Sequence, residues 1–353
     1  MKTRVKVGLI GTGDIGQVHA RALAELAEVE LCIAALIQPE VEQRLAQQYG
    51  AQLYPNCEAM WCDPSVDAVV ICVPSDLHRE YTVQALQAGK HVLCEKPMAL
   101  TLSDADAMLE ASRQSGRFLM IGHVLRFWPE WVATKQALTE GLVGKPLAIS
   151  SRRMVSVLAG TQGDRGWRHD PHRSGGAVLD MQIHDLDAFC WFYDAFPTTV
   201  FTRGIRSPDG AWSHVFTHLE FPEGRQAFVE ASFMMRGNPI DIFFRILGTE
   251  RSIEYTFDPA TFTLHEIEGV QDARTGSTLM LYEWKQPPKE LFEKTEDPYR
   301  AAFRQQAAYL VECVRTGQSP RMGTGEQARR ALALGLASLQ SCESGLLVPI
   351  TES

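Results

Sequence analysis

The sequence predicts an α/β protein in which a doubly wound parallel sheet comes first and a second domain with a mainly antiparallel sheet follows. Three observations predict this. The chain opens with an apolar strand, a glycine turn and an amphipathic helix. Strands and helices then alternate, as in parallel sheets that helices cover on both faces. From residue 147 onward, strand-like segments follow one another between Gly, Pro and Asp turns, which is typical of antiparallel sheets.

The opening strand, turn and helix are typical of a dinucleotide-binding unit. Val5–Ile10 is short and almost wholly apolar, as a strand covered on both faces should be. In the turn, Gly11 permits a tight bend, Gly13 lets backbone N–H groups approach a pyrophosphate, and Gly16 lets the helix pack closely on the strand. The positive end of the helix dipole then faces the phosphates. The alternative is an ordinary glycine-rich turn.

The rest of the first domain continues the alternation. Further strands are expected at 29–37, 66–73, 91–94 and 118–122, and helices at 39–50, 79–89 and 103–116, the last capped by Ser103. Because the carboxyl ends of parallel strands lie at one edge, the glycine turn, Pro74-Ser75 and Glu95-Lys96-Pro97 are expected around one crevice. We expect the domains to be 1–122 and 123–353.

The second domain is expected to begin with a connecting helix at Pro129. Its predicted strands are 147–158, 200–206, 215–221, 226–234, 240–247 and 252–257. Its predicted helices are 177–193, 299–316 and 325–345, and the segment 269–298 has the least regular pattern.

Length, charge and cysteine usage exclude several classes of protein. A chain of 353 residues suggests two domains, and a net charge of −9 leaves no basic surface for nucleic acid. No apolar run approaches the roughly 18 residues of a membrane span, and the opening apolar run is too short for a signal peptide. The eight cysteines are scattered, without a Cys-x-x-Cys pair. We therefore expect a cytoplasmic protein without membrane, nucleic-acid or metal partners, and His169–His172 is interpreted as a solvated loop.

Cofactor choice stays open on these residues. A dinucleotide site usually places Asp or Glu about 20 residues past the glycines to bind the adenosine ribose. The chain has Leu36-Ile37-Gln38 there, with neither an acid nor an adjacent Arg or Lys for a 2′-phosphate. Gln38 can bond a ribose hydroxyl without charge.

Two places carry candidate catalytic groups. In the predicted helix 177–193, an apolar stripe runs beside a polar one, and Asp180 and His184 share the polar stripe at a spacing that lets them touch. A carboxylate beside an imidazole fixes its tautomer and raises its pKa, as a general base requires. The alternative is a solvated face with an incidental pair. Lys96 lies just past a strand at the expected crevice, where its ammonium can bond an alcohol oxygen; the alternative is an exposed loop lysine.

Taken together, the motifs resemble those of the Gfo/Idh/MocA family of NAD(P)-dependent sugar and polyol dehydrogenases, over essentially the whole chain. The matching segments are Gly11-Thr12-Gly13-Asp14-Ile15-Gly16, Val73-Pro74-Ser75-Asp76-Leu77-His78, Glu95-Lys96-Pro97, Gly122-His123, Arg126-Phe127, Trp167-Arg168 and Ser174-Gly175-Gly176 followed by Asp180-Met181-Gln182-Ile183-His184. The resemblance implies a Rossmann domain followed by an α/β domain whose large open sheet commonly supports dimers or tetramers.

The resemblance also implies roles for individual residues. The implied catalytic residues are Lys96, Asp180 and His184. The implied cofactor-binding residues are Gly11, Gly13, Asp14, Ile15, Gly16, Gln38, Pro74, Ser75, His78, Glu95, Lys96, Trp167 and Arg168. The implied substrate contacts are Lys96, His123, Asp180 and His184.

The implied reaction is hydride transfer between a nicotinamide cofactor and a secondary alcohol of a sugar, polyol or cyclitol. Many members have an acid where this chain has Leu36 to Gln38, so the resemblance favours NAD over NADP only weakly. Two alternatives are a redox-neutral glycosidase that keeps NAD bound and a sugar or dinucleotide sensor without catalysis. The sugar itself is not identified.

Overall fold

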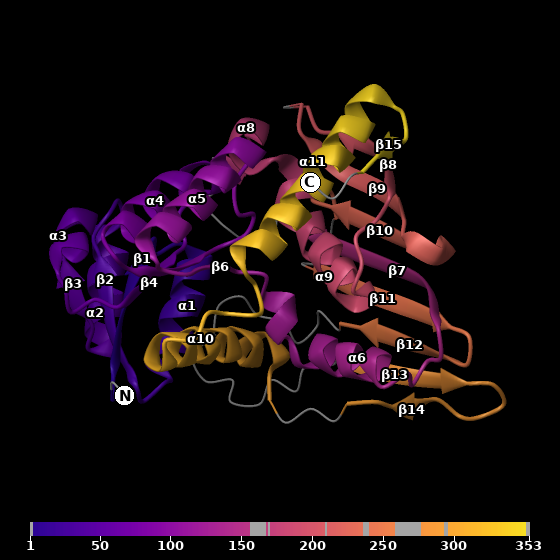
Figure 1. The fold of residues 1–353 in the computed structure, drawn as a ribbon, viewed down its shortest axis with the longest axis horizontal. Helices are drawn as coiled ribbons and strands as arrows, with labels where there is room; N and C mark the ends of the chain where they lie inside the picture. The colour runs from indigo at the N-terminus through magenta and orange to yellow at the C-terminus, as the bar shows by residue number, and fades with distance from the viewer. Residues whose placement is uncertain are drawn as a thin grey trace. The chain divides into compact units, whose positions relative to one another are not determined.

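The computed structural model describes residues 3–155, 167–168, 170–208, 210–235, 240–257, 277–292 and 296–350. By packing, the chain forms two compact units: unit 1 is Met1–Phe127 with Tyr299–Arg329, and unit 2 is Trp128–Pro298 with Arg330–Ser353 (Figure 1). The chain thus returns to unit 1 near its end, which an analysis along the sequence does not reveal. The expected boundary at Gly122 stays a prediction.

Unit 1 contains a six-stranded sheet in the order β3-β2-β1-β4-β5-β6, with every pair parallel. Its strands are β1 Val5–Ile10, β2 Val29–Ala34, β3 Gln52–Tyr54, β4 Ala68–Ile71, β5 His91–Cys94 and β6 Leu119–Ile121. The strand order reverses between β1 and β4, which is the point where doubly wound sheets bind ligands outside the carboxyl ends of the strands. The predicted parallel sheet is confirmed.

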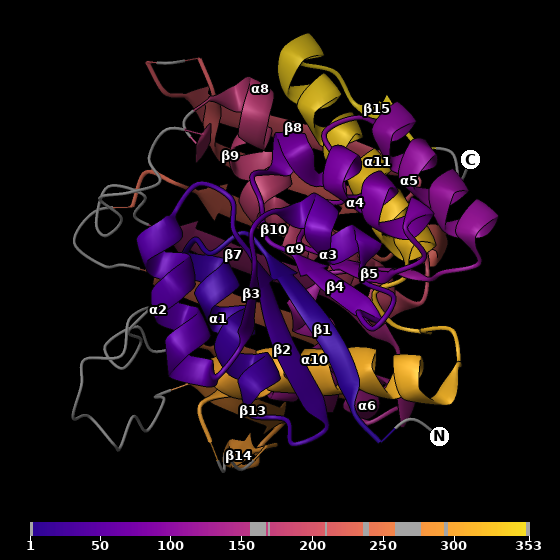
Figure 2. The same ribbon diagram turned by 90° about the vertical axis from the view of Figure 1, so that its left-hand side faces the viewer.

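Helices cover both faces of this sheet, with α1 and α2 on one side and α4 and α5 on the other (Figure 2). The helices of unit 1 are α1 Asp14–Ala24, α2 Pro39–Tyr49, α3 Cys57–Cys62, α4 His78–Gln87, α5 Leu102–Ser115 and α10 Pro298–Thr316, with the 3₁₀ turns η1 Ser75–Leu77 and η2 Val124–Phe127. The expected cap of α5 is wrong: Thr101, not Ser103, is the N-cap, and its side chain accepts a hydrogen bond from the backbone N–H of Asp104.

Unit 2 contains a nine-stranded sheet in the order β14-β13-β12-β11-β7-β10-β9-β8-β15. Its strands are β7 Pro146–Val155, β8 Thr199–Arg206, β9 Trp212–Glu220, β10 Gln226–Ser232, β11 Ile240–Gly248, β12 Arg251–Thr256, β13 Thr278–Glu283, β14 Lys289–Glu290 and β15 Val348–Pro349. Among the described strands, β7 and β10 alone pair in parallel, so the predicted mainly antiparallel sheet is confirmed. The hairpin β13–β14 lies in the segment that we expected to be least regular.

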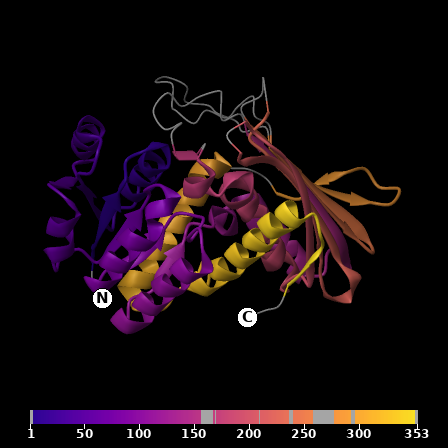
Figure 3. The same ribbon diagram turned by 90° about the horizontal axis from the view of Figure 1, so that it is seen from above.

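The long helices of unit 2 lie on one face of its sheet, which Figure 3 shows nearly edge-on with α9 and α11 on that face, whereas the turn η4 connects β9 to β10. The helices of this unit are α6 Pro129–Thr139, α8 Pro171–Ser174, α9 Ile183–Tyr193 and α11 Gly325–Ser344, with the π-helical turn η3 Val178–Gln182 and the 3₁₀ turn η4 Pro222–Gly224. Trp131 of α6 stacks on Phe192 of α9 at 5.5 Å and meets Phe244 of β11 edge-on at 4.7 Å. This aromatic cluster forms part of the core between the helices and the sheet.

Two further findings apply to the described residues. None of their helices is both long enough and apolar enough to cross a membrane. Nor do they contain a group of three or more His, Cys, Asp or Glu side chains that could hold a metal ion. Of the segment interpreted as a solvated loop, His169 lies outside the described residues. The interpretation is wrong for the rest: Pro171 and His172 begin the short helix α8, and the Asp170 side chain accepts a hydrogen bond from the backbone N–H of His172 at 2.9 Å.

Candidate active site

The first and third glycines of the turn after β1 have no room for a side chain. Gly11 has φ of +90°, and a Cβ there would lie 2.5 Å from the carbonyl oxygen of Cys72. A Cβ on Gly16 would lie 2.1 Å from the carbonyl oxygen of Gly11. Gly13 is the N-cap of α1 and provides no side-chain cap, and Asp14 and Ile15 form the half-buried first turn. The backbone N–H groups at this helix end are thus left for a ligand, so the turn fits a dinucleotide pyrophosphate.

The loop after β2 is held by a carboxylate from α2. Gln38 is half-buried and is the N-cap of α2, and its backbone N–H donates to Oε1 of Glu42 at 3.2 Å. The backbone N–H of Leu36 donates to the same oxygen at 2.9 Å. The side chain of Ile37 between them is 85% exposed.

The loops after β4 and β5 are joined by His78. Its Nδ1 lies 2.7 Å from the carbonyl oxygen of Pro97, and its Nε2 lies 3.0 Å from that of Val73. Burial lowers the pKa of His78, and the two carbonyl contacts oppose that shift only in part. A neutral ring donates to only one of these carbonyls at a time, whereas a protonated ring would donate to both, which is why the two carbonyls raise the pKa while burial lowers it. Pro74 and the buried Ser75 lie in the first of these loops.

Glu95 and His19 form a buried pair directly behind Lys96. Nε2 of His19 donates to Oε1 of Glu95 at 2.8 Å, and the backbone N–H of Lys96 donates to Oε2 at 3.1 Å. Burial raises the pKa of Glu95, but the hydrogen bond and charge of His19 and the charge of Lys96 outweigh it, so the pKa is lowered overall. Both carboxylate oxygens therefore have partners, and the backbone of the half-buried Lys96 is fixed.

His123 follows β6 and is buried. Its backbone N–H donates to the carbonyl oxygen of Ile121 at 2.7 Å, and its own carbonyl accepts from Arg126 at 3.1 Å. The residue thus belongs to a tight turn at the carboxyl end of the sheet of unit 1.

In unit 2, Arg168 reaches Asp180. The guanidinium Nε lies 3.4 Å from Oδ2 of Asp180, and the same guanidinium lies over the Trp167 ring at 4.6 Å. The Ser174 hydroxyl donates to the Arg168 carbonyl at 3.0 Å. Gly175 and Gly176 both have positive φ, which lets the chain turn sharply into the following helix.

The helix that carries Asp180 and His184 differs from the predicted one. Val178–Gln182 is a π-helical turn, so the regular spacing assumed for the two side chains does not hold there, and their contact stays a prediction. The alternative of a solvated face is wrong for Asp180, which is 4% exposed, whereas His184 is half-buried. Single π turns occur frequently at functional sites.

Two family models match the chain. One, described as an oxidoreductase family with an NAD-binding Rossmann fold, matches residues 5–123, and the other, the GFO/IDH/MocA C-terminal domain, matches residues 131–254. The chain belongs to the Gfo/Idh/MocA family. The model that matches the first domain describes oxidoreductases, and this chain is one. The two matches cover both the sheet that carries the glycine turn and most of the second sheet.

Individual relatives agree with the family. The chain is 30% identical to the 1,5-anhydro-D-fructose reductase of Ensifer adhaerens over 82% of this chain and 81% of the relative. It is 26% identical to the scyllo-inositol 2-dehydrogenase (NAD(+)) of Bacillus subtilis, over 99% and 97% of the two chains. A solved levoglucosan dehydrogenase in complex with NADH and L-sorbose has the same fold, with a TM-score of 0.83, 21% identity and coverage of 99% and 100%.

Three interactions of this Gfo/Idh/MocA protein were not predicted from the sequence, although Arg168 itself was expected at the cofactor. His19 pairs with Glu95, Glu42 holds the loop after β2, and Arg168 pairs with Asp180. Each is an interaction between separate elements, which periodicity within one element does not show. The available signals were weak: a histidine on the helix behind the glycine turn, and an acid in the first turn of the next helix.

Proposed function

We propose that the protein transfers a hydride reversibly between a nicotinamide cofactor and a secondary alcohol or ketone of a sugar, polyol or cyclitol. The observation that carries the proposal is the glycine turn, where a Cβ on Gly11 or Gly16 would meet backbone at 2.5 or 2.1 Å while the end of α1 has no side-chain cap. The activities named for the relatives, on anhydrofructose and inositol, support the substrate class.

Individual residues have distinct proposed roles. The nicotinamide, when bound, supplies the hydride acceptor or donor. His184 takes the hydroxyl proton as general base, and Asp180 orients the imidazole. Lys96 donates a hydrogen bond to the oxygen on which negative charge develops. Arg168 holds the carboxylate of Asp180, since the two side chains form an ion pair.

The remaining proposed contacts surround the cofactor and substrate. Asp14, Ile15 and Gln38 contact the dinucleotide beside the glycines, and Pro74, Ser75, His78, Glu95, Trp167 and Arg168 line it elsewhere. His123 contacts the substrate or the nicotinamide. NAD is the proposed cofactor, and the match to an NAD-binding Rossmann family supports it.

The alternatives of a redox-neutral glycosidase and a sensor are less well supported. The relatives named above are a reductase and a dehydrogenase, which perform net redox chemistry. Lys96, Asp180 and His184 are all present, which a sensor without catalysis does not require.

We also propose a cytoplasmic homodimer or homotetramer. All eight cysteines are free thiols, as is usual in a reducing compartment. The face of the unit 2 sheet that lacks a described helix carries exposed apolar side chains, which supports assembly through that face.

The first test is a titration of the purified protein with NADH, followed by a panel of sugars and inositols monitored by the absorbance of the reduced nicotinamide. We expect turnover on at least one polyol. His184→Ala should lower kcat by about 10²- to 10⁴-fold, the usual contribution of a general base, while the affinity for NADH is kept. His172→Ala removes an exposed histidine of the same unit and serves as the control. Near-normal turnover of His184→Ala would remove the residue from this role.

A further inference from the structure

A buried carboxylate lies in the first turn of α2. Glu42 is 1% exposed, and its Oε1 accepts two hydrogen bonds, from the backbone N–H groups of Leu36 and Gln38 at 2.9 and 3.2 Å. Its other oxygen, Oε2, accepts no hydrogen bond from any described residue. Backbone N–H groups at the positive end of a helix therefore stabilise this carboxylate.

This carboxylate lies where the adenosine ribose of a dinucleotide is recognised. β1 and β2 pair in parallel, with Ile10 opposite Ala34, so the loop after β2 is next to the glycine turn. Side chains tie the same two regions together: Arg44 of α2 donates to Gln17 of α1 at 2.9 Å, and Gln17 donates to the carbonyl oxygen of Thr12 at 3.2 Å. In dinucleotide folds, the end of the second strand is where the 2′-hydroxyl of NAD or the 2′-phosphate of NADP is bound.

Glu42 disfavours a 2′-phosphate in two ways: it already accepts the backbone N–H bonds that a phosphate would accept, and its negative charge would repel the phosphate. Phosphates bind at helix N-termini by accepting backbone N–H bonds. Here the N–H groups of Leu36 and Gln38 already donate to Glu42, and Pro39 at the first helical position has none. A buried carboxylate also repels a second anion nearby, because the interior screens charge poorly. A 2′-hydroxyl is uncharged and meets no such repulsion.

We infer that Glu42 makes the protein selective for NAD over NADP, by occupying with an internal anion the position that a 2′-phosphate would take. The residue thus replaces the acid that is absent from Leu36-Ile37-Gln38, from the following helix instead of from the strand end. The inference rests on the proposed function, since it requires a dinucleotide on the glycine turn.

The nearby guanidinium of Arg44 would favour NADP instead. Arg44 is exposed on the same helix, two residues beyond Glu42. A guanidinium is well suited to phosphate, so an Arg44 released from Gln17 would favour NADP. The experiment must therefore distinguish the effect of Glu42 on nucleotide preference from that of Arg44.

The test measures dissociation constants of the full chain for NADH and for NADPH by nucleotide fluorescence, at fixed salt because charge effects are screened. We expect the wild-type protein to bind NADH more tightly. Glu42→Gln keeps the acceptor oxygen and removes the charge, so it should tighten NADPH binding about tenfold and leave NADH binding nearly unchanged. Glu42→Ala also frees the two N–H groups and should tighten NADPH at least as much. Thermal unfolding without nucleotide verifies that each variant is folded.

Glu40→Gln is the matched control, because it removes an exposed carboxylate from the same helical turn. It should leave the NADH-to-NADPH ratio unchanged. A ratio that is equally unchanged in both Glu42 variants would overturn the inference. So would a wild-type protein that prefers NADPH and loses that preference in Arg44→Ala. If the wild-type protein binds neither nucleotide, the proposed function fails and the inference fails with it.

Discussion

At the scale of single residues, Lys96 depends on a side chain 77 positions away in the sequence, His19. The imidazole donates to Glu95, and Glu95 accepts the backbone N–H of Lys96, so the three form one buried chain of hydrogen bonds. Gly122 also packs against Glu95, because a Cβ on this glycine would lie 2.9 Å from Oε1 of Glu95. His19 is a positioning residue, since it acts on Lys96 through Glu95.

His19→Ala should lower kcat by about tenfold through a misplaced Lys96, with a much smaller effect on NADH affinity. Without the hydrogen bond from His19, burial raises the pKa of Glu95, so the acid limb of the kcat profile should move to higher pH. His19→Gln, which restores an N–H donor, should recover part of both effects. A purely structural role would lower stability and leave the pH profile unchanged. pH profiles of kcat for the three proteins decide between these outcomes.

The glycines of the dinucleotide turn were predictable because their spacing along one segment reflects their function. Glu42 was not predictable in the same way. The sequence places Gln38 where the acid is usual, and only the packing of α2 against the loop brings a carboxylate there. The spacing of residues within one element does not predict contacts with another element. The pairing of Arg168 with Asp180 is a second example.

At the scale of elements, the long periodic segments were predicted and the short or irregular ones were missed. α1, α2 and α10 follow their apolar spacing, and α2 and α10 also begin at a Pro and end before a Gly. β3 and α3, with three and six residues, are too short to show a period. The π turn η3 was missed because its residues have the same apolar character as a regular helix, and only backbone hydrogen bonding distinguishes it.

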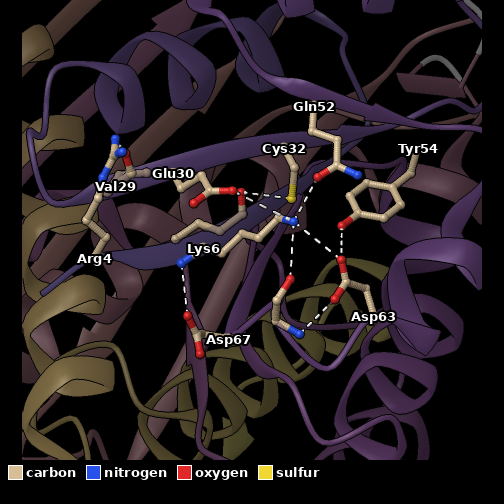
Figure 4. Close-up of polar contacts among 11 residues, drawn as sticks. Arg4, Lys6, Val29, Glu30, Cys32, Gln52, Tyr54, Asp63 and Asp67 are labelled. Atoms are coloured by element: carbon tan, nitrogen blue, oxygen red, sulfur yellow. Dashed lines mark hydrogen bonds and ion pairs between the residues drawn. The ribbon is translucent and has the colours of Figure 1, made fainter. Parts of the chain in front are cut away.

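β1 takes part in a polar cluster that was not predicted, because its sequence is almost wholly apolar. Lys6 is 8% exposed, and its ammonium lies 2.8 Å from Gln52, 3.2 Å from Ser65 and 3.3 Å from Asp63 (Figure 4). The Tyr54 hydroxyl also donates to Asp63. The cluster therefore ties β1 and β3 to the segment that precedes β4, at the opposite end of the sheet from the glycine turn.

Asp63 should make the stability of this cluster pH-dependent. Hydrogen bonds from Ser65 and Tyr54, with a further one from Lys6, hold the pKa of Asp63 well below its usual range. A carboxyl whose pKa is lowered by folding stabilises the protein above its unfolded pKa of about 4, and this stabilisation is lost as the pH falls through the folded pKa. Asp63→Asn should lower the free energy of unfolding by about 1 to 2 kcal/mol at pH 7.

The check is denaturant unfolding of both proteins at several pH values. The difference between them should shrink as the pH falls below about 4. Glu58→Gln, at an exposed position in the adjacent α3, is the control and should show little difference at any pH. A difference that is constant across the whole range would mean that the charge of Asp63 contributes nothing.

At the scale of the whole molecule, the sheet of unit 2 exposes several large apolar side chains on the face that no described helix covers. Ile205, Phe216 and Phe228 lie on neighbouring strands of that face and are 53%, 52% and 50% exposed. Phe228 stacks on His218, with ring centroids 4.5 Å apart. Monomeric proteins rarely expose contiguous apolar patches of this kind, so the face is suited to burial against a second copy of the chain.

Phe216→Asp together with Phe228→Asp should convert the proposed oligomer to monomers, because the interface would lose two apolar side chains and would have to desolvate two carboxylates. Sedimentation velocity at micromolar concentration measures the mass directly. Val132→Asp is the control: Val132 is 38% exposed on α6, a helix on the opposite face of the sheet, and its substitution should leave the assembly intact. A wild-type protein that sediments as a monomer would refute assembly altogether. An oligomer that persists in the double variant would place the interface elsewhere, because two buried charges cost more than a stable interface of ordinary size can absorb.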